Sequence, residues 1–184
     1  MIEWCVRREG ELDADDHERL AALLRAAFPH YAHAYPGRRS WAGARPELRV
    51  IAHDGPVPVA HAGVLRRFVQ VGEGEQLVAV VGMVAVHPDR QGGGVGRALG
   101  ERLAAALRAL PVPFGLLGCG PDRVGFYRAI GWHLLPPTPV SYSPLDVDDA
   151  SRVVTDDDGW MLLPVAAAVE DWPPGAVRWH GGMI

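Results

Sequence analysis

A glycine-rich stretch in the middle of the chain combines residue types and spacing that point to anion chemistry. It follows an apolar, largely β-branched run at residues 76–86 and precedes a pattern typical of a helix. The first N–H groups of a helix lack partners within the helix and carry partial positive charge, and glycines let the backbone approach an anion closely. Strand, loop and helix in this order therefore predict a phosphate site. The loop residues are Gln91, Gly92, Gly93, Gly94, Val95 and Gly96.

Two other phosphate motifs are excluded by the residues present. A Walker loop needs a lysine, and the 184-residue chain has none, while a dinucleotide fingerprint needs a third glycine where Leu99 stands. What remains, Q-x-x-G-x-G at a helix start, resembles the acetyl-CoA loop of the GCN5-related N-acetyltransferase (GNAT) superfamily. The resemblance implies that the loop amides hold the cofactor diphosphate, and the flanking Arg90 and Arg97 are expected to add positive charge for its phosphates. It places the pantetheine along Val84, Ala85 and Val86.

A second segment, PDRVGFYRAIGW at residues 121–132, resembles the next signature of that superfamily. When an amine attacks a thioester, the departing thiolate can take a proton from a phenol within hydrogen-bond reach. The resemblance implies that Tyr127 is this general acid. The alternative is a tyrosine that packs its ring inside and leaves its hydroxyl at the rim. By the same resemblance, a peptide N–H near Met83 and Val84 polarises the thioester carbonyl.

Two narrower families share further text with the chain. Residues 39–47, RSWAGARPE, closely resemble the nodulation-protein-A acyltransferases, which place a fatty acyl group on the free amine of a chitin oligosaccharide. Residues 60–68, AHAGVLRRF, resemble both that family and the aminoglycoside 2′-N-acetyltransferases, and the acidic turn and tryptophan-containing tail near the C-terminus extend the likeness. His61 in this stretch is either a base or substrate contact, or a hydrogen-bonded core histidine.

Both families acylate an amine on a sugar ring, which indicates what an acceptor site would contain. Protonated amino sugars attract carboxylates, and sugar faces stack on aromatic rings. The alternative is that the acidic turns are solvated surface and the tryptophans are packing residues. Aromatic residues at 29–39 either line the same cleft or cover the core. The candidate substrate-binding residues are Trp41, Glu47, Asp157, Asp158, Asp171 and Trp172.

One departure from the aminoglycoside enzymes concerns the general base. Those enzymes have an acidic residue on the central strand, whereas residues 78–86 here contain no carboxylate. An amine must lose a proton before it attacks, so a proton acceptor is needed. Either water linked to Glu47 or an acidic turn supplies it, or the substrate differs.

Composition excludes several classes. A net charge of −4 argues against a nucleic-acid partner, and the lack of lysine removes Schiff-base chemistry. Cys5 and Cys119 are too few for a disulfide scaffold or a zinc site, so no metal is expected. No stretch is long and apolar enough for a membrane span and no signal peptide is evident, so we expect a cytoplasmic protein without a membrane partner. Residues 1–184 are expected to form one domain.

Periodicity predicts the elements that hold these residues. We expect strands at 2–7, 47–53, 57–71, 76–86, 114–118 and 160–165, a turn at Asp54, and a further acidic turn at 146–150. Helices are expected after the caps at 13–16 and after the glycine loop, where Leu99, Leu103, Leu107 and Leu110 form one stripe. The fold class is α/β (α+β): a GNAT fold with a central mixed, mostly antiparallel, twisted sheet of six to seven strands flanked by about four helices.

Taken together, the sequence predicts an N-acetyltransferase that moves an acetyl group from acetyl-CoA to an amine of a small-molecule amino sugar in a ternary complex. An aminoglycoside acylated at its 2′ amine is the first hypothesis. The alternative is a nodulation-protein-A-like enzyme with a longer acyl donor. Hypotheses from other classes are a non-catalytic acyl-CoA sensor and an enzyme that acylates protein amines. A homodimer is left open.

Overall fold

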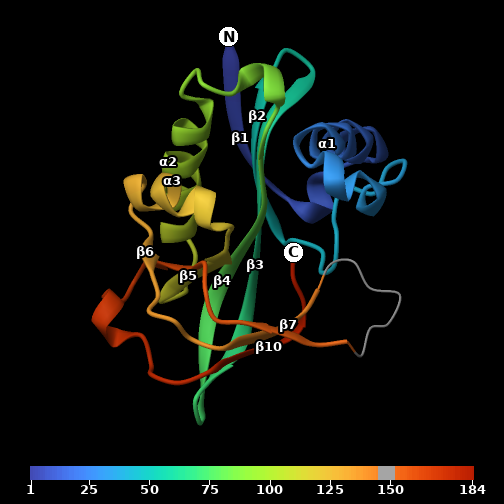
Figure 1. The fold of residues 1–184 in the computed structure, drawn as a ribbon. Coiled ribbons are helices and arrows are strands. Elements are labelled where there is room, and N and C mark those ends of the chain that lie inside the picture. The colour runs from blue at the N-terminus through green and yellow to red at the C-terminus, as the bar shows by residue number, and fades with distance from the viewer. Residues whose placement is uncertain (145–151) are drawn as a thin grey trace.

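The computed structural model describes residues 1–144 and 152–184, and the acidic turn expected at 146–150 lies outside them. Ten strands in these ranges form one mixed sheet, more than the six to seven expected (Figure 1). The strands are β1 (Ile2–Arg8), β2 (Leu48–Asp54), β3 (Val57–Val71), β4 (Gly74–Val86), β5 (Phe114–Gly118), β6 (His133–Leu134), β7 (Val140–Ser143), β8 (Val154–Asp156), β9 (Trp160–Pro164) and β10 (Val177–Gly182). The α-helices are α1 (Ala14–Ala27), α2 (Val95–Arg108) and α3 (Val124–Ala129), and the 3₁₀ helices are η1 (Glu9–Glu11), η2 (Pro29–Ala34), η3 (Pro88–Arg90), η4 (Pro121–Arg123) and η5 (Val169–Asp171).

The first four strands form an antiparallel meander, and its long hairpin of β3 and β4 lies at the centre of the sheet. The predicted turn between β2 and β3 is confirmed, with Gly55 in the left-handed region at φ 58°. Strand β3 is long enough to serve two arms of the sheet: its first half pairs with β2, and its far end pairs with β10. The extra strands β7, β8 and β10 continue that second arm.

Helix α2 crosses over between β4 and β5, which are parallel neighbours. Its predicted stripe is buried against the sheet at Leu99, Leu103 and Leu107, but the helix ends at Arg108, so Leu110 lies in the turn that follows and is partly buried. Helices α2 and α3 cover one face of the sheet, and α1 covers the other (Figure 1). The two faces therefore carry separate apolar layers around β3 and β4.

Helix α1 begins where the sequence predicts a cap. The Asp13 carboxylate accepts hydrogen bonds from the N–H groups of Asp15 and Asp16, which satisfies two of the helix's free donors. Leu20, Leu23 and Leu24 then face the sheet. Within residues 1–144 and 152–184, no helix has the length and apolarity needed to cross a membrane, and no group of three or more potential ligands could hold a metal ion.

Candidate active site

Strands β4 and β5 diverge and open a cleft at the centre of the molecule. Among the described residues they pair only where Val78–Val80 lie beside Phe114–Leu116. Beyond that point a cleft of about 850 Å³ separates them. Its walls come from β4, the start of α2, the end of β5, α3, the segment after α1, and the C-terminal tail. The lining includes Val81, Gly82, Met83, Val84, Ala85, Val86, Gln91, Gly92, Gly96, Cys119, Asp122, Arg123, Phe126, Tyr127, Met183 and Ile184.

The glycine loop forms one end of this cleft. Gly92 and Gly94 have φ values of 78° and 83°, which residues with a Cβ rarely adopt, and Gly94 caps α2 without a side chain. In the part of the chain that the structure describes, the N–H groups of residues 92–97 donate to no protein acceptor. Gln91 binds the Val86 carbonyl at 3.1 Å and so ties the loop to β4. The loop can therefore offer several free N–H groups to an anion.

The predicted loop residues differ in how they sit. Gln91, Gly92 and Gly96 line the cleft. Gly93, Gly94 and Arg97 are exposed next to it, and Val95 is buried beneath it, so these four contribute backbone groups or loop shape. The Arg97 side chain pairs with Glu101 at 3.3 Å, one turn further along α2.

Strand β4 carries a bulge at the middle of the cleft. Gly82 pairs with Gly63 and Ala85 pairs with His61, so two residues of β4, Met83 and Val84, stand opposite one residue of β3. Met83 has φ 50°, a conformation that typically costs about 1–3 kcal/mol for a residue with a side chain. The bulge interrupts the β3–β4 ladder in the part of β4 that no longer pairs with β5. It re-aims the peptide groups that face the cleft.

His61 lies behind the bulge and is fully buried. Its Nδ1 is 2.9 Å from the Met83 carbonyl oxygen, and its Nε2 is 3.1 Å from Nη1 of Arg49. Burial and the positive charge of Arg49 lower the pKa of His61 to about 3, so the ring is neutral near pH 7. Of the two interpretations left open by the sequence, the structure favours the hydrogen-bonded core histidine.

Arg49 and Glu9 extend this polar cluster, and sequence reasoning missed both. Arg49 is fully buried on β2, and it forms an ion pair with Glu9 at 2.6 Å and donates to the Ser40 carbonyl at 3.0 Å. Burial alone would raise the pKa of Glu9, but hydrogen bonds from Arg49 and Arg45 outweigh it and lower that pKa. A charged residue inside the apolar run of β2 was the available signal.

Tyr127 lies across the cleft from β4, on α3. Its ring packs edge-on against Phe126 and Trp132, with centroids 5.1 and 5.9 Å away, and its side chain lines the cleft. Burial raises the pKa of the Tyr127 hydroxyl well above its ordinary value, and the nearby Cys119 adds to this shift. The phenol therefore stays protonated near neutral pH and can donate a proton.

The two predicted substrate residues from the first part of the chain do not line the cleft. Trp41 packs edge-on against His17 and lies under the Arg45 guanidinium, 4.5 Å from the ring centroid. Glu47 forms an ion pair with Arg66 at 2.6 Å. Both side chains therefore contact residues outside the cleft, and neither lines it.

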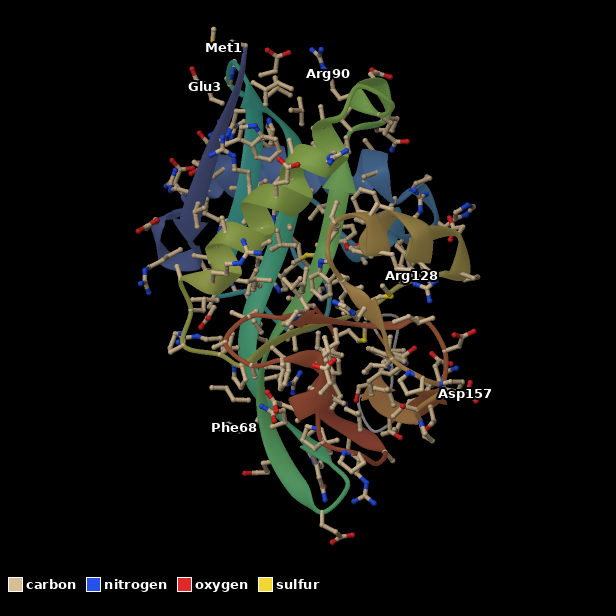
Figure 2. The ribbon with its side chains drawn as sticks, turned by 90° about the vertical axis from the view of Figure 1, so that its left-hand side faces the viewer. Met1, Glu3, Phe68, Arg90, Arg128 and Asp157 are labelled. Carbon is tan, nitrogen blue, oxygen red and sulfur yellow. The ribbon has the colours of Figure 1, made fainter. Side chains whose placement is uncertain are left out.

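The other four predicted substrate residues lie in the connections from β8 to β9 and from β9 to β10, and they do not line the cleft either. Asp158 accepts from the N–H of Gly159 at 2.8 Å, and Asp171 accepts from that of Ala168 at 2.9 Å. Trp172 packs edge-on against Phe114, with centroids 5.3 Å apart. Asp157 is exposed, far from Arg90 beside the glycine loop (Figure 2).

The part of the cleft beside η2 is instead lined by aromatic side chains. Phe28, His30, Tyr31 and Tyr35, in and around η2, line it, so the aromatics of this segment face the cleft rather than only covering the core. Among the described lining residues, the one side-chain carboxylate is Asp122, on the α3 side next to Arg123. This part of the cleft is therefore lined by aromatic residues, and its described lining lacks a cluster of side-chain carboxylates.

Comparison with known proteins places the chain among described relatives. The sequence matches the family described as Nodulation protein A (NodA) over residues 1–182. It is 35% identical to Nodulation protein A of Sinorhizobium terangae over 189 residues, covering 94% of this chain and 92% of that protein. It is also 35% identical to Nodulation protein A of Rhizobium meliloti (strain 1021) over 190 residues, covering 98% and 96%.

Solved structures show the same fold at low sequence identity. A GNAT family acetyltransferase from Brucella melitensis in complex with acetyl-CoA superposes with a TM-score of 0.60 at 21% identity, covering 97% of this chain and 96% of that one. The GNAT family N-acetyltransferase YhbS from Escherichia coli in complex with CoA gives a TM-score of 0.63 at 16% identity, covering 98% and 91%. The predicted GNAT fold is therefore confirmed.

Proposed function

This chain belongs to the Nodulation protein A (NodA) family and is an acyltransferase, and we propose that it transfers an acyl group from a CoA thioester to a free amine of an amino sugar. The observation that carries the proposal is one continuous cleft. Free N–H groups of residues 92–97 lie at one end, the strained bulge at Met83 lies in the middle, and the protonated phenol of Tyr127 faces it.

The donor fits the first half of this cleft. The loop amides and the start of α2 suit the diphosphate, and the pantetheine would run along Val84, Ala85 and Val86 towards the bulge. Two proteins of the same fold hold acetyl-CoA or CoA, which supports this assignment. The thioester carbonyl would then lie beside the bulge, within reach of a peptide N–H.

The chemical step follows from that placement. The lone pair of the acceptor amine attacks the thioester carbonyl carbon, a C–N bond forms, and the C–S bond breaks. The departing thiolate takes the proton of the Tyr127 hydroxyl, the amide nitrogen loses its extra proton to water, and solvent returns a proton to the tyrosine. Atoms and charges balance without a metal or a redox partner.

The part of the cleft beside η2, which we assign to the acceptor, distinguishes between the two amino-sugar hypotheses. A multiply charged aminoglycoside calls for carboxylates, and the six predicted acidic and aromatic residues do not line the cleft. Ring faces at Phe28, Tyr31 and Tyr35 suit the apolar face of a sugar or an acyl chain. The family and the cleft together favour the nodulation-type alternative, with an acyl group longer than acetyl, over the aminoglycoside.

A thiol-release assay tests the proposal. Acetyl-, octanoyl- and palmitoyl-CoA are each incubated with the protein and with a chitosan oligomer, an aminoglycoside or a peptide as acceptor. Mass spectrometry then measures the mass of the product. We expect release with the chitosan oligomer and an acylated sugar product. Donor binding without release across all acceptors would instead support the non-catalytic sensor.

Tyr127→Phe is the matched catalytic variant. Its hydroxyl makes no hydrogen bond to the described residues, so the fold and the affinity for CoA should be preserved. Turnover should fall by about 100-fold or more, because a positioned general acid typically contributes that much. Unchanged turnover would remove the tyrosine from the mechanism. A homodimer, a one-domain chain and a cytoplasmic location stay predictions.

A further inference from the structure

A chain of polar contacts runs from Glu9 on η1, through Arg49 on β2, to the back of the bulge. The Glu9 carboxylate accepts two hydrogen bonds from Arg49, at 2.6 and 3.2 Å. Arg49 donates to Nε2 of His61 at 3.1 Å, and Nδ1 of His61 lies 2.9 Å from the Met83 carbonyl oxygen. Arg49 and His61 are both fully buried. The proposed donor and acceptor touch none of these side chains, so the mechanism above leaves them without a role.

The arginine fixes which nitrogen of the imidazole carries the proton. A guanidinium has only donors, so Nε2 of His61 must accept from Arg49. A neutral ring then carries its proton on Nδ1, and Nδ1–H donates to the Met83 carbonyl. Glu9 compensates the buried charge of Arg49 and holds the guanidinium in a two-point contact. The donor and the acceptor of each hydrogen bond from Arg49 to the Met83 carbonyl are therefore determined.

The Met83 carbonyl in turn fixes the next N–H group. A peptide unit is planar and trans, so the Met83 carbonyl and the Val84 N–H point in opposite directions. The carbonyl points to His61 on β3. The Val84 N–H therefore points away from β3, towards the side of β4 where pairing with β5 has ended and the cleft lies.

We propose that Glu9, Arg49 and His61 are positioning residues that hold the Val84 N–H at the thioester carbonyl oxygen; this rests on the proposed function for the identity of the acyl donor. The strained backbone at Met83 explains why a support is needed. Without the bond from His61, rotation of the Met83–Val84 peptide would turn the Met83 carbonyl oxygen towards the cleft. A carbonyl oxygen there would repel the negative charge that develops on the thioester oxygen.

Substitutions at His61 separate positioning from packing. His61→Phe fills the space but cannot donate to Met83. His61→Asn keeps a donor, because the amide nitrogen of asparagine and Nδ1 of histidine are both bonded to Cγ. We expect turnover to fall about 10- to 100-fold in His61→Phe, less than the loss of a whole oxyanion donor. We expect His61→Asn to recover most of the activity, and both variants to bind CoA, which has no acyl carbonyl, as the wild type does.

An infrared signature reports the contact itself. With ¹³C-carbonyl acetyl-CoA bound and no acceptor present, the carbonyl band should lie at lower frequency than in water for the wild type and His61→Asn. It should return towards the free value in His61→Phe and shift part of the way in Arg49→Met. Val50→Ala is the control, since Val50 is as buried as its neighbour Arg49 but belongs to the apolar core. It should leave the band unchanged.

Two measurements keep this inference separate from the proposed function. Calorimetry of CoA and the thiol-release assay on the wild type test the function. Nitrogen NMR of the ligand-free wild type tests the series of contacts from Glu9 to Met83, because these contacts require His61 to carry its proton on Nδ1. A ring protonated on Nε2, or His61→Phe with wild-type turnover and a wild-type band, would overturn the positioning role even if the enzyme is an active acyltransferase.

Discussion

Acidification should destabilise this protein at a pH where its carboxylates are still ionised, and His61 is the reason. Its imidazole is fully buried, and burial together with the charge of Arg49 lowers its pKa to about 3, although the bond to the Met83 carbonyl opposes the shift. In the unfolded chain the same imidazole has its ordinary pKa of about 6.5. The unfolded state therefore binds a proton that the folded state excludes.

The size of the effect follows from these two pKa values. The stability due to the neutral ring is fully present above pH about 6.5 and is lost as the pH falls from there towards 3. Well inside that window the loss is about 1.4 kcal/mol per pH unit. Between pH 7.5 and pH 5.0 the free energy of unfolding should drop by about 2 kcal/mol through His61 alone.

Other groups act in the same direction, so a variant must isolate the contribution of His61. Burial is the largest cause of the lowered pKa values of His17 and His53, which add to the loss over the same range. The pKa of Glu9 is lowered from an ordinary value of 4.5, so its contribution is lost mainly below that pH. When the free energy of unfolding is measured in urea from pH 7.5 to pH 5.0, it should fall by about 2 kcal/mol less in His61→Asn than in the wild type, since asparagine does not titrate.

His53→Asn is the matched control, because His53 is only partly buried and should leave most of the slope in place. If His61→Asn and the wild type lose stability in parallel within about 0.5 kcal/mol over this range, the ring is not the neutral, desolvated group described here. The hydrogen-bond direction inferred for Met83 would then lose its basis as well.

Three further outcomes are expected. His30→Ala should lower turnover because His30 lines the acceptor end, whereas His33→Ala on the same 3₁₀ helix should not; equal losses in the thiol-release assay would contradict this. A Cβ at Gly100 would come within 2.4 Å of the Ile130 Cδ1, so Gly100→Ala should cost about 1–3 kcal/mol in thermal unfolding and loosen α3, and an unchanged melting temperature would refute the contact. Trp172→Ala should cost about 2 kcal/mol of stability but keep kcat/KM, whereas a selective rise in KM for the sugar would restore Trp172 as a substrate residue.

The elements that carry the proposed donor half of the site could be predicted from the sequence because they are local. Strand β4, the glycine loop and α2 are contiguous, and each has its own signal: an apolar run, glycines, and leucines at helical spacing. The strand and the stripe of leucines were placed correctly to within a few residues. Only the helix end was overestimated, because Leu110 continues the apolar spacing past the last helical turn.

Residues 136–144 were expected to form an extended edge segment and contain β7, but β8 and β10 escaped prediction because their stability is not local. Strand β8 has only three residues, and β10 joins the sheet by pairing with β3 more than a hundred residues earlier. Short segments near prolines carry little periodic signal. Their strand conformation depends on an edge that is supplied by a distant part of the chain.

The predicted acidic residues do not line the cleft, for a physical reason that residue types cannot reveal. A carboxylate can bind a charged ligand, or it can accept from a backbone N–H one to three residues away, and both uses occur in polar turns. Asp158 and Asp171 have the second use, with Gly159 and Ala168 as donors. Trp172 likewise meets Phe114 across a long sequence separation. Only the partners decide the role.

The proposed acceptor half draws on three distant segments, and this division has a consequence for specificity. Residues 27–35, 81–83 and 183–184 contribute to the lining of the cleft, while the proposed donor-binding residues lie at 84–97. Gly82 allows this meeting, because a Cβ there would come within 2.1 Å of the Ile184 carbonyl oxygen. Changes in η2 or in the tail can therefore alter which amine or acyl chain is accepted while the loop still binds CoA, so acceptor preference and donor binding should vary independently.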